Sequence, residues 1–200
     1  MALKFAVNNS LSAITSLPSG ISGGALNLIS TQTASASATI DFTSGIDSTY
    51  DSYVFKWINC HPSTNGANFT FQADTGTNTN YNQTITSTCF RAYHGEDDSN
   101  DFGYKSNGDQ AQGTGFQGLN FGLGTENDEC STGYLQIFNP SSSVFVKHFI
   151  SNGQLNTASN ESENDIVAGY FNTTTPITRV RFKMSSGNID DGIIKMCGVS

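Results

Sequence analysis

The sequence predicts an all-β fold, a two-sheet β-sandwich of jelly-roll type, and three observations support this prediction. Apolar and polar side chains alternate with a period of two in several short runs, as in half-buried strands. Turn-forming residues separate these runs at close intervals. Only 13% of the residues are charged, whereas Gly, Ser, Thr and Asn are abundant. A single domain of roughly nine to eleven strands is therefore expected.

The first 24 residues differ in pattern from the rest of the chain. Residues 1–24 keep no sustained period and are predicted to form an extended N-terminal arm. A short helix through Leu11 and Ile14, capped by Ser10, is the alternative, because the apolar spacing there is helical. Residues 25–200 carry the strand signals and are predicted to form one β-sandwich domain.

Three runs alternate clearly between apolar and polar side chains. They are residues 38–42, 67–73 and 179–184. In each run the apolar side chains are predicted to be buried and the polar side chains to face solvent. In the second run, Asn68, Thr70 and Gln72 are the positions expected to face solvent.

Four further runs are apolar on both sides. They are residues 53–60, 133–138, 144–150 and 166–171. Strands of this kind lie in the middle of a sandwich or turn one outer face toward another subunit. We therefore expect a homo-oligomer.

The connections between strands are also readable in part. Residues 94–114 and 122–132 are acidic or rich in Gly and are predicted to be exposed loops. The glycines of residues 113–124 alternate with Phe and Leu and lead into no helical pattern, which indicates a strand with bulges rather than a nucleotide-binding loop.

Charge and cysteine spacing exclude several classes of partner and cofactor. The net charge of −8 opposes binding to nucleic acid or to anionic lipid. No apolar stretch suits a signal peptide or a membrane span, so synthesis in the cytosol and no membrane partner are expected. The four cysteines form no Cys-x-x-Cys pair and are predicted to be free thiols. No cofactor is expected.

No catalytic or metal-binding motif rises above background, so the chain is predicted not to be an enzyme. It contains neither a Gly-x-Ser-x-Gly elbow nor a phosphate-binding loop. The acidic stretch 96–101 lacks the spacing of a calcium loop and is interpreted as a solvated loop. A polysaccharide hydrolase stays as an alternative, which requires two suitably separated carboxylates. The acids considered for it are Glu96, Asp97, Asp101, Glu126 and Asp128.

The carboxyl-terminal residues 180–200, VRFKMSSGNIDDGIIKMCGVS, resemble the end of a group of structural proteins from marine and other tailed bacteriophages. In that group the segment is a terminal hairpin, and Tyr is usual where this chain has Cys197. Residues 1–20, 30–51 and 138–150 resemble the same proteins. In such a hairpin, apolar residues of the first strand would meet those of the second, with Gly187 and Gly192 at the bends. The residues expected to meet are Phe182, Met184, Ile194 and Met196.

The resemblance implies a sandwich used as a capsid decoration, tail knob or fibre head. It further implies a virion protein assembled in the host cytoplasm, with other virion proteins as partners. The homo-oligomer is expected to be a trimer. The resemblance touches both ends and the middle of the chain.

A second hypothesis places the same fold at a fibre tip as an adhesin for host-surface glycan or receptor. Aromatic rings near polar loops can stack on sugars while neighbouring amides and carboxylates bond to hydroxyls. The candidate ligand residues are Tyr81, Tyr93, Phe102 and Tyr104.

Overall fold

The computed structural model describes residues 26–200, and the strands in that range number twelve, with no helix. This is one strand more than the upper end of the sequence prediction. The predicted arm at residues 1–24 and the alternative helix after Ser10 lie outside the described residues. No helix among residues 26–200 is long and apolar enough to span a membrane.

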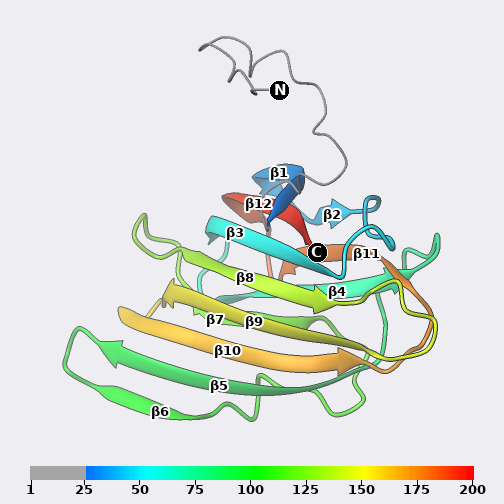
Figure 1. The fold of residues 1–200 in the computed structure, drawn as a ribbon. Coiled ribbons are helices and arrows are strands. Elements are labelled where there is room, and N and C mark those ends of the chain that lie inside the picture. The colour runs from blue at the N-terminus through cyan, green and yellow to red at the C-terminus, as the bar shows by residue number, and fades with distance from the viewer. Residues whose placement is uncertain (1–25) are drawn as a thin grey trace, which may run out of the picture.

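The strands form two antiparallel sheets that face one another, as Figure 1 shows. The larger sheet has eight strands in the order β1 (Asn27–Ser37), β12 (Ile189–Val199), β3 (Ser52–Pro62), β8 (Ser131–Phe138), β9 (Lys147–Asn156), β10 (Glu161–Phe171), β5 (Ile85–Gly95) and β6 (Asn100–Tyr104). The smaller sheet has four, in the order β2 (Ile40–Phe42), β11 (Ile177–Met184), β4 (Ala67–Thr75) and β7 (Gln117–Leu123). The predicted two-sheet, all-β architecture is confirmed, and the jelly-roll subtype stays a prediction.

An aromatic cluster fills the space between the two sheets. The ring of Phe182 stacks on that of Phe69 with centroids 5.7 Å apart, and it lies 5.5 Å from Phe55 of the opposite sheet. Phe42 and Phe71 complete the contacts around it, at 6.2 and 6.4 Å. All five side chains are buried. Because each large ring removes much apolar surface from water, this cluster contributes strongly to the stability of the fold.

The polar side of β4 departs from the prediction. Thr70 and Gln72 were expected to face solvent, but they are 5% and 0% exposed. The Gln72 side-chain amide donates hydrogen bonds to the carbonyl oxygens of Gln83 and Gly115, at 3.0 and 2.8 Å. Connecting segments thus cover this face of the smaller sheet, and they satisfy the amide that they bury.

The predicted carboxyl-terminal hairpin is wrong. β11 pairs with β2 and β4 in the smaller sheet, whereas β12 pairs with β1 and β3 in the larger one. Phe182 and Met196 both lie in the core, but they reach it from opposite layers. Two strands that each carry an apolar side can bury it face to face as well as side by side, and the alternation alone does not distinguish these arrangements.

Two predictions about connections have different outcomes. Residues 100–104, expected within a loop, form the edge strand β6. The bulged strand expected in residues 113–124 is confirmed, because the pairing of β7 with β4 shifts register twice and Gly122 has a φ of 76°. The first strand was missed because it is short and lies within an acidic stretch of sequence.

The unequal width of the sheets creates an overhang. β7 forms an edge of the smaller sheet and packs against β9 and β10. β5 and β6 lie beyond β10 in the larger sheet, where no strand of the smaller sheet lies opposite (Figure 1). The inward side of this strand pair is therefore free to line a cleft.

Candidate functional site

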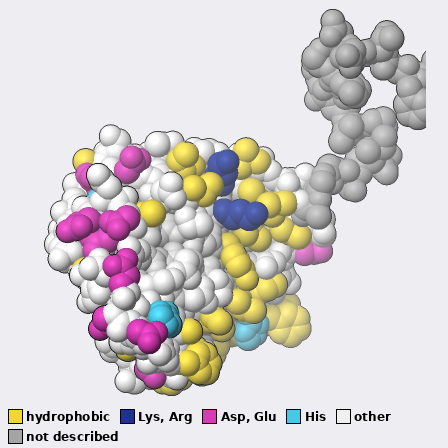
Figure 2. All heavy atoms as spheres, turned by 90° about the vertical axis from the view of Figure 1, so that its left-hand side faces the viewer, with side chains coloured by type: hydrophobic (Ala, Val, Ile, Leu, Met, Phe, Trp, Pro, Cys, Tyr) yellow, Lys and Arg dark blue, Asp and Glu magenta, His cyan; other side chains and the backbone are white. Residues whose placement is uncertain are grey.

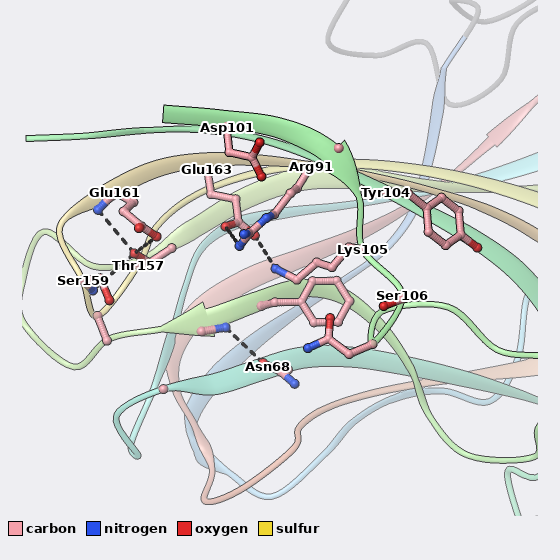
Figure 3. A pocket seen from close by; sticks show the side chains of 16 residues that line it. Asn68, Arg91, Asp101, Tyr104, Lys105, Ser106, Thr157, Ser159, Glu161 and Glu163 are labelled. Carbon is pink, nitrogen blue, oxygen red and sulfur yellow. Dashed lines mark hydrogen bonds and ion pairs between the residues drawn. The ribbon is translucent and has the colours of Figure 1, made fainter. Parts of the chain in front are cut away.

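A cleft of about 730 Å³ opens beneath the overhang. Its walls come from β5, β6 and β10 on one side, and from β7 and the turn at residues 157–159 on the other. The size falls within the range of small-molecule sites. Most lining side chains are polar or charged, and Figure 3 shows Arg91, Lys105 and Glu163 directed toward one another within it.

Two cations converge on one buried carboxylate at the cleft floor. Glu163 is 1% exposed and accepts a hydrogen bond from Lys105 Nζ at 2.6 Å. The other carboxylate oxygen accepts one from Arg91 Nη1 at 3.4 Å. The Lys105 ammonium also lies 4.5 Å from the centre of the Phe121 ring. These contacts hold both cations in fixed positions.

A second carboxyl group, that of Asp165, lies deeper and is fully buried. Its Oδ2 accepts a hydrogen bond from Asn120 Nδ2 at 3.2 Å. Its Oδ1 is 4.0 Å from Lys105 Nζ and has no hydrogen-bond partner among the described residues. Burial, followed by the negative charge of Glu163, raises the pKa of Asp165 to about 8. At neutral pH this carboxyl is therefore mostly protonated.

The cleft floor is joined to the core by a chain of hydrogen bonds. Asn120 Oδ1 accepts from Ser131 Oγ at 2.6 Å, and that hydroxyl oxygen accepts from Trp57 Nε1 at 2.7 Å. All three side chains are buried. Because each member is satisfied by the next, the chain fixes the position of Asn120 and with it the orientation of Asp165.

The four predicted ligand residues are not brought together. Tyr93 is half-buried and lies 4.9 Å below the guanidinium of Arg91. Tyr104 borders the cleft, but its hydroxyl bonds to Asp109 and its ring turns away from Glu163 (Figure 3).

The other two of these residues lie elsewhere. Phe102 is 75% exposed, and strand alternation places it on the opposite side of β6 from Asp101 and Gly103. For Tyr81 the predicted exposed position is wrong. It is 2% exposed, with its ring covered by the Arg181 guanidinium at 4.0 Å.

The carboxylates considered for hydrolysis are also dispersed. Asp101 lines the cleft, whereas Glu96 and Asp128 line a separate hollow of about 570 Å³. Asp97 accepts the backbone N–H of Ser99 in its own loop. Among residues 26–200 no group of His, Cys, Asp or Glu is arranged to hold a metal ion. The four cysteines are free.

Sequence reasoning missed the charged floor, although a signal was present. In β10, Glu163 and Asp165 share the inward phase of Val167 and Phe171, which are buried. In β5, Arg91 likewise shares the phase of Cys89. Charged residues in phase with a buried side indicate a paired cluster, because an isolated buried charge is too costly.

The outer face of the larger sheet carries an exposed apolar band. Its side chains are 39–50% exposed and come from six neighbouring strands. They are Tyr104, Phe90, Ile166, Ile150, Tyr134 and Ile58. In Figure 2, hydrophobic side chains gather along the right-hand part of the view, whereas acidic ones gather on the left. The strands expected to be apolar on both sides thus bury one apolar side in the core and expose the other in this band.

Comparison with models of protein families, with curated proteins and with solved structures finds no match for this chain. The fold and the cleft define it as an all-β, two-sheet protein with a polar cleft at an overhanging sheet edge.

Proposed function

We propose that this protein is a structural protein of a bacteriophage virion, either a capsid decoration or a tail-associated module exposed on the particle surface. The observation that carries the proposal is the apolar band on the outer face of the larger sheet. Contiguous exposed apolar surface is unusual on a monomer and marks a docking site. The resemblance of residues 180–200 to tailed-phage structural proteins supplies the biological setting.

The partner that best fits the band is a second copy of the same chain. Each copy carries a net charge of −8, so two copies repel unless they meet where acids are absent. The outward positions of β5, β10, β9 and β8 include no Asp or Glu. Burial of the band removes apolar area without bringing like charges together. A homo-oligomer, with three copies as the expected order, follows from this proposal.

Two measurements test it. Mass spectrometry of dissected phage heads and tails should find the protein at a fixed copy number, and its absence from purified particles removes the proposal. Sedimentation velocity should show an oligomer that Ile166→Asp dissociates. Thr79→Asp adds the same charge at an exposed loop position and should leave the oligomer intact.

A second candidate function is an adhesin for host-surface glycan, favoured by the polar cleft. Fixed donors and acceptors at its floor suit a ligand with many hydroxyl groups. Purified protein should then adsorb to host cells and compete with the phage. Absence of both effects contradicts this candidate and leaves the structural role unaffected.

A further inference from the structure

Gly103 has no role in the fold that requires glycine. It lies within β6, and it is not among the residues with a positive φ. A Cβ added to it would meet no atom within 4 Å. By contrast, a Cβ on the strand residues Gly133 and Gly169 would meet backbone atoms at 2.4 and 2.6 Å. Glycine weakens a strand. Where neither the backbone conformation nor the packing requires glycine, its presence in a strand indicates that a ligand or another molecule approaches the backbone closely.

Hydrogen-bond donors and acceptors surround the backbone of Gly103, which no side chain covers. Its register partner on β5 is Arg91. Asp101 and Lys105, two residues before and after it, line the same cleft. Figure 3 shows Asp101, Arg91 and Lys105 around one part of the cleft. The missing side chain at Gly103 therefore leaves a seat with an acceptor on one side and cationic donors on the other.

We propose that the cleft binds a neutral saccharide, with one sugar ring seated on Gly103 between Asp101 and Arg91. This inference rests on the second candidate function and specifies its ligand and contact residues. A sugar hydroxyl donates to the Asp101 carboxylate while a neighbouring hydroxyl accepts from the Arg91 guanidinium. Both are charge-assisted hydrogen bonds, which are stronger than those between neutral groups.

The charges of the cleft select a neutral sugar over an acidic one. Three acids line it, Asp101, Glu161 and Glu163, against two cations. Both cations, Arg91 and Lys105, already donate to Glu163. A carboxylate on the ligand would thus find no unpaired cation and would lie among like charges. A hydroxyl group, which donates as well as accepts, meets no such penalty.

The test places a side chain in the space above Gly103 and leaves the fold intact. The probes are neutral di- and trisaccharides of glucose, galactose, mannose and N-acetylglucosamine, each paired with its uronic-acid counterpart. Binding is followed by ligand-observed NMR and by titration calorimetry on the full chain. Wild type should bind at least one neutral probe more tightly than its acidic counterpart. Gly103→Val should weaken that binding by about tenfold or more and should keep or raise the melting temperature, because valine favours strands.

A matched control is Ala92→Val, which adds bulk to the same strand pair on the opposite, exposed side. It should bind the probe as wild type does. If Gly103→Val lowers the melting temperature, Asp101→Asn replaces it, since Asp101 is exposed and its loss of charge should weaken binding without unfolding.

The outcomes separate the inference from the function on which it rests. Equal binding by wild type, Gly103→Val and Asp101→Asn overturns the seat, while glycan binding stands. Tighter binding of the acidic probes overturns the choice of a neutral ligand. If wild type binds no probe and also fails to adsorb to host cells, the inference falls together with the adhesin candidate. Adsorption to cells without binding to any probe overturns only the inference.

Discussion

The two ends of the larger sheet bury their inward sides in different ways. Beneath β3, the smaller sheet supplies aromatic rings, and Phe55 packs against Phe182 at 5.5 Å. Beneath β5 and β6 there is no such cover, and the inward positions hold Arg91 together with its partner Glu163. An aromatic core gains stability from non-directional burial, whereas a charged cluster gains fixed geometry at a cost of desolvation. The first region stabilises the fold, and the second holds charged side chains in fixed positions.

The largest expected effect is the loss of a ring from the aromatic region. Phe182→Ala should lower the free energy of unfolding by about 3–5 kcal/mol, because it removes buried area and leaves a cavity among four other rings. Urea denaturation followed by tryptophan fluorescence measures it, since Trp57 is in the same core. Phe102→Ala, at a 75% exposed position, is the control and should change stability little. Similar losses in both variants would contradict the assigned core.

Removal of one cation tests the charged region. Lys105→Met should lower the free energy of unfolding by about 2–3 kcal/mol, because Glu163 stays buried and loses its shortest hydrogen bond. The double variant Lys105→Met, Glu163→Leu should recover much of this loss, since it leaves no charge unpaired. A double-mutant cycle from urea denaturation gives the coupling between the two side chains. Additive effects would show that the pair is not coupled.

These two regions also differ in how well sequence predicts them. The alternation at Val180 and Phe182 signals a buried strand side, because apolar burial leaves a local mark every second residue. The pairing of strands leaves no such mark, so β11 and β12 were expected as a hairpin but lie in different sheets. The cleft was missed for a related reason. Arg91, Lys105 and Glu163 are distant in sequence and become a cluster only when β5, β6 and β10 align.

Titration of Asp165 separates the two regions by pH. Burial and the nearby negative charge of Glu163 raise its pKa in the folded chain from the usual value for Asp to about 8. The native state therefore holds this proton more tightly than the unfolded chain does, and the associated stability is lost as pH rises toward and through 8. Asp165→Asn mimics the protonated form, so its stability relative to wild type should increase from about pH 5 to about pH 9. Denaturation at several pH values measures this difference.

A matched variant distinguishes this effect from general titration of acids. Asp97→Asn removes an exposed carboxyl whose pKa is held below its usual value by hydrogen bonds from Ser99, so the carboxyl is ionised throughout this pH range and the difference from wild type should stay nearly constant. A constant difference for Asp165→Asn as well would mean that Asp165 is ionised in the folded chain. In that case the cleft floor would carry one negative charge more than described above.

The smallest expected effect lies outside both regions, on the outer side of β11. Arg181 donates two hydrogen bonds to Asp41 at 2.7 and 2.6 Å, and burial of these side chains is only partial. Solvent screens such a pair, so Asp41→Asn should cost about 0.5–1 kcal/mol, with a weaker effect at high salt. Arg181→Ala should cost more, because it also uncovers the ring of Tyr81. Equal losses in the two variants would show that the ion pair alone matters here. A larger loss for Arg181→Ala would instead show that a charged side chain stabilises this sheet mainly by covering an aromatic ring, as phenylalanines do in the core.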